Sequence, residues 1–470
     1  LGTAVFLFVF AVGQYVGIAN YNWMAPYAHE LTHGVALALG SIAALSRWRR
    51  DGGAGLVALS GFLLGLCFLT KAEAFLAGLA GSGVLLLTGF RGRSGRDLGL
   101  WVGSVAAPAI LVWIGLGPEA ALGSVSSLTS GVAELSFYLA GLGLDDPPLR
   151  LAETVTWASI WVLALGIPVA AAWLARGTTS PLAGPVALVL TGSLFLLGGD
   201  RIPWTESLRP LQLVTLVVLG GLLFARLTGA GSGKLSVDAD GDDPDAERTT
   251  REAGLDTALA LGVLGLALLA KMLLNTRSAH YGFALAAPGT AFTVAALWSW
   301  LPDALDRLGL RGDVVRGAVL AMLAAFCAAH VQTTATWMER KTETVGEGRD
   351  VLRTDLRGAF VQLAVEHVSD AGYRSVAVLP EGVMINYLAR TPNPTPYINF
   401  MPPEEILFSD AAWVAAFRAS PPDAVVIVPK DTSEFGRGPF GFGYGIELSR
   451  WVREEYTPGP SLRIDGVSYE

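Results

Sequence analysis

Residues 54–70 read Ala54-Gly-Leu-Val-Ala-Leu-Ser-Gly-Phe-Leu-Leu-Gly-Leu-Cys-Phe-Leu-Thr70, and no charged side chain interrupts this apolar run. A transmembrane helix needs about 20 apolar residues, with a range of about 17–25. Similar runs recur along the chain, so we predict a mainly α-helical, polytopic membrane bundle with about eleven spans. The predicted spans are 1–19, 29–46, 54–70, 74–90, 99–116, 152–175, 182–198, 208–227, 255–274, 283–300 and 314–331.

The composition agrees with a membrane protein. Of the 470 residues 52% are hydrophobic and 16% are charged, whereas soluble proteins carry about 25% charged residues. The net charge of −8 is not evidence about partners, because many of the acidic residues lie in one linker and in the C-terminal region. The expected partner at this stage is the lipid bilayer. No basic cluster typical of nucleic-acid binding is present. Since Leu1 already lies inside an apolar run, we expect the natural protein to begin further upstream.

Lys and Arg residues accumulate in alternate loops, about thirteen against about five. Because basic loops stay in the cytoplasm, this asymmetry predicts a multi-pass protein of the plasma (inner) membrane with a defined orientation. The 228–254 loop is rich in Gly, Ser and Asp, which predicts a flexible cytoplasmic linker. The loops predicted to be cytoplasmic are 47–53, 91–98, 228–254 and 301–313, whereas 199–207 is predicted to be external.

The pattern changes after residue 331, which separates a membrane domain, 1–331, from a C-terminal domain, 332–470. Short β-branched runs alternate there with amphipathic stretches, which predicts a small α/β domain with a parallel sheet. An odd number of spans makes this domain extracytoplasmic. The predicted strands are 375–379 and 424–428, and the predicted helices are 357–370, 381–389 and 409–419.

The sequence His29-Glu30-Leu-Thr-His33 matches the HExxH zinc pattern. On a helix, His29 and His33 share one face and would bind one metal, with Glu30 as general base. A protease also needs a third ligand. At the usual distance the chain offers Gly52, Gly53 and Ala54, with Asp51 just before them. Three interpretations remain open: a zinc metalloprotease, a divalent metal bound for another purpose, and histidines that make ordinary hydrogen bonds.

Polar residues also concentrate in the loops that are predicted to be external, including 20–30, 199–206 and 275–281. Ionisable groups near a membrane are costly unless paired or solvated, so they indicate a site; the alternative is anchoring at the membrane surface. Lys71 ends the apolar run and Glu73 follows it. Lys71 either extends its ammonium group to the surface or binds a lipid-linked phosphate, with Glu73 tuning it.

Three segments resemble the C-type (GT-C) glycosyltransferases, in particular the protein O-mannosyltransferase and lipid A aminoarabinose transferase group. The first, Gly61-Phe-Leu-Leu-Gly-Leu-Cys-Phe-Leu-Thr-Lys-Ala-Glu73, is similar to a helix end of that family. The second, Lys271-Met-Leu-Leu-Asn-Thr-Arg-Ser-Ala-His-Tyr-Gly-Phe-Ala284, resembles a late external loop. The third, Leu379-Pro-Glu-Gly-Val-Met-Ile-Asn-Tyr-Leu388, resembles the start of the soluble domain.

This resemblance implies transfer of a sugar from a polyprenyl-phosphate-linked donor to an acceptor lipid, glycan or protein on the extracytoplasmic side, with no required cofactor. In the family an acidic residue of the first external loop acts on the acceptor. That loop would precede Leu1, so Glu30, with His29 and His33, is the best remaining catalytic candidate. The residues expected to bind the donor phosphate are Lys71, Glu73, Arg277, His280 and Tyr281. The alternatives are the zinc metalloprotease and a non-catalytic or transport protein.

Overall fold

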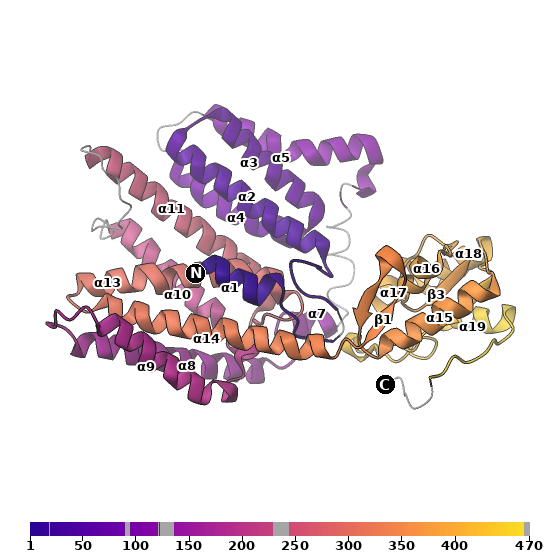
Figure 1. Ribbon diagram of the computed structural model, residues 1–470. Helices are drawn as coiled ribbons and strands as arrows, with labels where there is room; N and C mark the ends of the chain where they lie inside the picture. Colours follow the sequence, from indigo (N-terminus) through magenta and orange to yellow (C-terminus); the bar gives the residue numbers. More distant parts are fainter. Residues whose placement is uncertain (18, 90–94, 121, 123–135, 229–243, 465–470) are drawn as a thin grey trace. The chain divides into compact units, whose positions relative to one another are not determined.

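The computed structural model describes residues 1–17, 19–89, 95–120, 122, 136–228 and 244–464. The chain divides into two compact units, shown as ribbons in Figure 1. The first comprises Leu1–Val125 and Gly141–Ala335, and the second comprises Ser126–Ala140 and Thr336–Glu470. The predicted boundary at residues 331–332 thus falls close to the point where the first unit ends.

The first unit is built from helices. A short α1 (Gly2–Val5) continues as a π-helical turn, η1 (Phe6–Ala11). The other short helical turns that the structure describes in this unit are η2 (Gly199–Arg201), η3 (Trp204–Glu206), η5 (Ala270–Met272) and η6 (Ala296–Trp300). The longer helices are α2 (His29–Asp51), α3 (Ala54–Thr70), α4 (Ala72–Gly89), α5 (Gly95–Leu116), α8 (Pro147–Leu174), α9 (Ala183–Gly198), α10 (Leu211–Thr228), α11 (Pro244–Leu269), α12 (Gly282–Ala295), α13 (Leu301–Arg307) and α14 (Gly312–Glu339).

Seven helical stretches within the described ranges are long and apolar enough to cross a membrane, and three shorter apolar helices accompany them. The mainly helical fold is confirmed, and the length and composition of these helices are consistent with a membrane protein; the total of eleven spans stays a prediction. Several predicted boundaries were wrong. Helix α14 continues through residues 331 and 332 to Glu339, and residues 301–307 of a predicted loop form α13. The first span, 1–19, is helical only as far as Ala11, and residues 244–254 of the predicted linker belong to helix α11. Pro244 suits the first turn of a helix, and the Ala, Glu and Arg residues that follow favour its continuation. Residues 229–243 lie outside the described chain.

Close approach between helices depends on small residues. A Cβ atom added at Gly61 of α3 would lie 2.5 Å from the Trp101 carbonyl oxygen of α5, and one at Gly65 would lie 2.3 Å from that of Val105. Side-chain hydrogen bonds add to this packing, because Ser41 of α2 bonds Ser60 of α3 at 2.8 Å. Small residues and interhelical hydrogen bonds are the usual means of association where apolar burial gives little preference between helix and lipid.

The second unit is a small α/β fold. Strands β3 (Val376–Leu379) and β4 (Ala424–Ile427) pair in parallel, as predicted, and β1 (Glu343–Val345) pairs with β2 (Leu352–Thr354) in an antiparallel hairpin that was not predicted. The helices are α7 (Ser136–Gly141), α15 (Arg357–Ala371), α16 (Val383–Ala389), α17 (Pro402–Phe408), α18 (Asp410–Ala419) and α19 (Ile446–Glu455). The predicted helices thus correspond to α15, α16 and α18. The extracytoplasmic location of this unit stays a prediction.

Candidate functional site

A loop of residues 273–281 connects η5 with α12 and holds several of the predicted site residues. Leu274 (φ 58°) and His280 (φ 48°) adopt the left-handed conformation that non-glycine residues rarely take. The Gln212 side chain of α10 fixes the beginning of the loop. Its amide nitrogen donates to the carbonyl oxygens of Leu269 and Met272 at 2.6 and 2.8 Å, and its oxygen accepts from the Leu274 amide at 3.3 Å. The loop conformation is therefore imposed by specific contacts.

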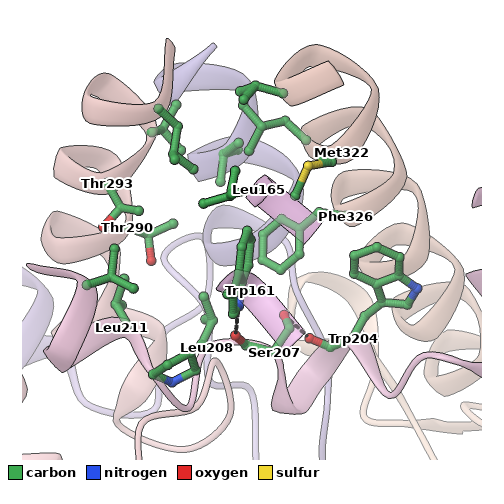
Figure 2. Close-up of a pocket in the computed structure, with 17 residues that line it drawn as sticks. Trp161, Leu165, Trp204, Ser207, Leu208, Leu211, Thr290, Thr293, Met322 and Phe326 are labelled. Carbon is green, nitrogen blue, oxygen red and sulfur yellow. Dashed lines mark hydrogen bonds between the residues drawn. The ribbon is translucent and has the colours of Figure 1, made fainter. Parts of the chain in front are cut away.

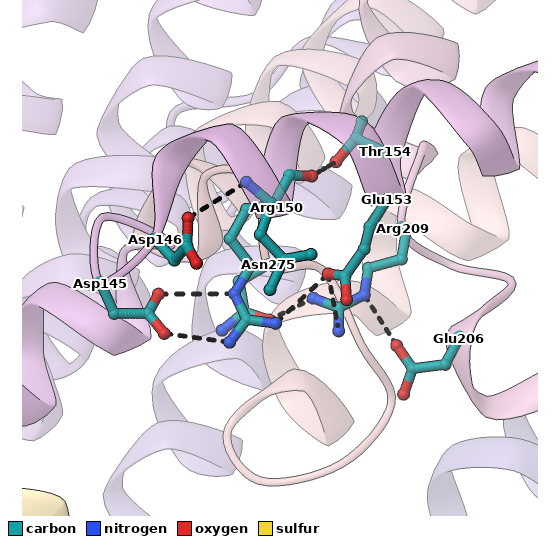
Figure 3. Close-up of polar contacts among 9 residues, drawn as sticks. Asp145, Asp146, Arg150, Glu153, Thr154, Glu206, Arg209 and Asn275 are labelled. Atoms are coloured by element: carbon teal, nitrogen blue, oxygen red, sulfur yellow. Dashed lines mark hydrogen bonds and ion pairs between the residues drawn. The ribbon is translucent and has the colours of Figure 1, made fainter.

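Arg209, which lies just before α10, joins this loop to two other segments (Figure 3). It is only 5% exposed. Its guanidinium donates to Glu206 at 2.7 Å, lies 3.4 Å from the Glu153 carboxylate of α8, and donates to the side-chain oxygen of Asn275 in the loop. One buried cation thus connects α8, the turn η3 and the 273–281 loop.

Arg150 extends the network at the beginning of α8. Its guanidinium pairs with Asp145 at 3.0 Å and with Glu153 at 3.2 Å, so the Glu153 carboxylate lies between two arginines. Asp146 caps the helix by accepting from the Leu149 amide at 3.2 Å. The sequence analysis did not assign Arg150, Glu153 or Arg209 to the site.

Arg277 differs from these arginines because no ion pair joins it to a carboxylate in the part of the chain that the structure describes. Its Nε is buried and has no hydrogen-bond partner there. Burial, followed by the positive charge of Arg209, lowers the pKa of Arg277. The hydroxyls of its neighbours Thr276 and Ser278, both fully buried, also lack partners. Unsatisfied buried donors are costly, so this loop has an unused capacity to bind an anion.

His280 packs on Tyr21, with ring centroids 5.1 Å apart, and Tyr21 also contacts Tyr281 at 6.0 Å. Burial lowers the pKa of His280 to about 4, and the charge of Arg277 acts in the same direction. The imidazole is therefore neutral near pH 7. A neutral His280 supplies no positive charge, but its ring nitrogens are suited to hydrogen bonding with the phosphate that the sequence analysis expects it to bind.

The two lysines at the helix ends are both paired. Lys71 Nζ lies 3.2 Å from Glu30 Oε1, and Lys271 pairs with Glu73. Lys271 also lies over the ring of Tyr281, 5.4 Å from its centroid. Glu73 was expected to tune Lys71, and Lys71 is a charged neighbour that acts on Glu73, although each of them forms its ion pair with another residue. Lys71 follows the last residue of α3 in an extended conformation, φ −152° and ψ 119°, and its side chain reaches α2.

The predicted phosphate-binding residues therefore fall into three linked groups. Glu73, His280 and Tyr281 are connected through Lys271 and Tyr21. Arg277 belongs with the arginine network. Lys71 pairs with Glu30, and it precedes α4, the helix that carries Glu73.

The HExxH residues occupy the first turns of α2. His29 and His33 are exposed, and their ring centroids lie 6.2 Å apart. No group of three or more His, Cys, Asp or Glu side chains suited to a metal occurs among the residues that the structure describes. Within those ranges the site stops at two imidazoles, one protein ligand short of a catalytic zinc site. Glu30, the expected general base, is engaged with Lys71.

An apolar pocket of about 70 Å³ (Figure 2) is lined in part by the residues on either side of Arg209 in the sequence. Ser207, Leu208, Pro210 and Leu211 form one wall, and Arg209, between them in sequence, belongs to the network. Trp161 donates from its indole nitrogen to the Ser207 carbonyl oxygen at 2.8 Å. The rest of the lining comes from α8, α12, α14 and neighbouring turns, including Trp204, Leu165, Thr290, Thr293, Met322 and Phe326. An apolar pocket therefore adjoins a strongly ionic surface.

Comparisons with known proteins give no match: no family model fits the chain, and no curated protein or solved structure is similar to it.

Proposed function

We propose that this chain is a membrane glycosyltransferase that transfers a sugar from a polyprenyl-phosphate-linked donor to an acceptor lipid, glycan or protein on the extracytoplasmic side of the plasma membrane. The observation that carries the proposal is Arg277, a partly buried guanidinium without a carboxylate partner in the described chain. Its charge interacts with those of Arg209 and Glu206, which are next in sequence to residues that line the apolar pocket. A ligand with an anionic head and an apolar chain matches both features.

The anionic head belongs at the 273–281 loop. A phosphate there would receive charge-assisted hydrogen bonds from Arg277, with the Thr276 and Ser278 hydroxyls as further donors. His280, neutral near pH 7, would add a hydrogen bond and no charge. The apolar chain belongs in the pocket, where Trp161 and Phe326 offer a ligand chain an apolar surface.

The transfer step needs a proton acceptor and a stabilised leaving group. The acceptor hydroxyl attacks the anomeric carbon and forms the new glycosidic bond, while the bond from that carbon to the phosphate oxygen breaks. The hydroxyl proton passes to Glu30, which is half-exposed at the beginning of α2. The negative charge that develops on the lipid phosphate is stabilised by Arg277 and Lys71. The Glu30–Lys71 contact of 3.2 Å keeps the acid and one cation adjacent.

Binding of farnesyl phosphate and farnesol to the full chain in lipid nanodiscs tests this proposal. We expect the phosphate to bind at least about tenfold more tightly than the alcohol, because a charged hydrogen bond contributes about 1.5–3 kcal/mol. Arg277→Ala should abolish this preference. Arg226→Ala, which removes ion pairs with Glu252 and Asp256, is the matched control and should retain it. Equal affinity of the wild type for both ligands would overturn the proposal.

Transfer itself is measured as release of prenyl phosphate from a prenyl-phosphate-linked hexose in the presence of membrane extract as acceptor. Glu30→Gln should bind the donor normally and release no prenyl phosphate. Release at the wild-type rate by Glu30→Gln would remove Glu30 from the reaction.

A further inference from the structure

Arg209 has an unusual position for a residue next to a membrane helix. It is 5% exposed, and its guanidinium reaches acceptors in three segments: Glu206 in its own turn, Glu153 in α8 and Asn275 in the loop. Arginine is suited to this role because its planar guanidinium presents several donors in a fixed geometry. Two of the three contacts are ion pairs that hold Arg209 itself, and the third acts on the loop.

The contact with Asn275 bears directly on Arg277. Asn275 lies two residues before Arg277 and one residue after Leu274, whose φ of 58° is unfavourable for leucine. A loop held in such a conformation needs contacts that compensate for the strain. The Arg209–Asn275 hydrogen bond is one of these contacts, and the charge of Arg209 also acts on Arg277.

Arg209 also lies between the pocket and the loop. Its neighbours Leu208 and Pro210 line the pocket, whereas its own side chain enters the ionic network. Arg209 thus connects the backbone of the pocket wall with the loop that would bind the anion.

We infer that Arg209 is a positioning residue for anion binding: through its hydrogen bond to Asn275 it holds the 273–281 loop in the conformation in which Arg277 receives the phosphate of the ligand. This inference rests on the proposed function, because it takes the lipid phosphate as the anion. Arg209 itself, engaged by two carboxylates, does not bind the phosphate.

The sharpest test changes Asn275. Asn275→Ala removes the hydrogen bond that Arg209 donates to the loop, and it leaves both ion pairs of Arg209 in place. The quantity to measure is the ratio of the dissociation constant of farnesol to that of farnesyl phosphate, for the full chain in nanodiscs. We expect Asn275→Ala to lower this ratio about tenfold and to leave the affinity for farnesol unchanged. Asn275→Asp, whose carboxylate still accepts from Arg209, should restore the ratio.

A purely structural role would give a different result, in which both ligands lose affinity together and Asn275→Asp rescues neither. Ser41→Ala is the matched control, because Ser41 is fully buried and bonds Ser60 and Ser82 between other helices; it should leave the ratio unchanged. An unchanged ratio in Asn275→Ala, while the wild type prefers the phosphate, overturns the inference about Arg209 alone. A wild type without that preference overturns the proposed function instead.

Discussion

Two ionic clusters lie at opposite ends of α10, and they differ in how completely they are paired. At one end, Asp256 is fully buried and accepts from Arg49 at 2.8 Å and from Arg226 at 3.0 Å. Glu252 is a further partner of Arg226 at 3.5 Å. At the other end, Arg209 is paired as thoroughly, but Arg277 has no carboxylate within the described residues.

The difference distinguishes arginines that stabilise the fold from an arginine that is able to bind a ligand. A buried carboxylate shared by two arginines joins α2, α10 and α11, and removing it would leave charges without partners. A partly buried arginine without a carboxylate contributes nothing comparable to folding and remains able to bind an external anion. We therefore expect changes at the Asp256 end to affect mainly stability, and changes at the Arg277 end to affect mainly binding.

The largest effect is expected for Asp256→Asn. It leaves Arg49 and Arg226 facing a neutral amide, so the free energy of unfolding should fall by about 3 kcal/mol, measured as a lower thermal midpoint in nanodiscs. The preference for farnesyl phosphate should not change in the protein that remains folded. Glu252→Gln, which affects a more exposed pair, should cost about 0.5 kcal/mol. Wild-type stability of Asp256→Asn would contradict the contrast between the clusters.

Arg277→Gln should give the opposite result. The change removes a partly buried charge and leaves no carboxylate unpaired, so the thermal midpoint should be equal to or higher than that of the wild type. The affinity for farnesyl phosphate should fall by about tenfold to a hundredfold, which corresponds to a loss of about 1.5–3 kcal/mol. A midpoint lowered as far as that of Asp256→Asn would show that Arg277 is a structural residue.

The Glu30–Lys71 pair is intermediate in character between the two clusters. Both of its charges are paired, but the side chains are partly exposed, 44% for Glu30 and 28% for Lys71. Exchanging the two residues sharpens the comparison. Glu30→Lys and Lys71→Glu should each lower stability, and the double variant should recover about 0.5–1 kcal/mol of the combined loss. Additive losses in a double-mutant cycle would mean that the pair makes no contribution to folding.

The smallest expected effect is a dependence of stability on pH that originates at His280, in the same loop as Arg277. The pKa of His280 is about 4 in the folded protein, below the value of about 6.5 for an unfolded chain. The unfolded state therefore binds more protons between these values, so the contribution of His280 to stability is complete above about pH 6.5 and is lost as the pH falls toward 4. His280→Gln should weaken the dependence of the thermal midpoint on pH over this interval. Saturating farnesyl phosphate should also weaken it, because a bound anion favours the protonated imidazole.

The sequence predicted elements whose signal is local. Apolar runs at 54–70 and 74–90 correspond to α3 and α4, and β-branched runs correspond to β3 and β4, because hydropathy and periodicity depend on neighbouring residues. Arg277 and His280 were chosen for a similar reason, as ionisable residues at a predicted helix end. Partners distant in sequence could not be predicted. The Arg209–Asn275 contact spans 66 residues and the Lys271–Glu73 contact spans 198.

The ion-pair partner of Lys71 belongs with these distant contacts. Lys71 is extended and follows the last residue of α3, and its side chain reaches Glu30, 41 residues earlier in the chain. The local sequence around Lys71 does not show this partner.

The two indoles of the apolar pocket give the protein an intrinsic optical probe. Trp161 and Trp204 both line the pocket, and Trp161 is held by its hydrogen bond to Ser207. A ligand whose apolar chain carries bromine atoms would bring a heavy-atom quencher against these rings. Tryptophan emission would then report occupancy of the pocket without a label on the protein. Because the chain has 13 tryptophans, the signal is the difference between the wild type and Trp161→Phe. The pocket can thus be followed by fluorescence before any donor sugar is known.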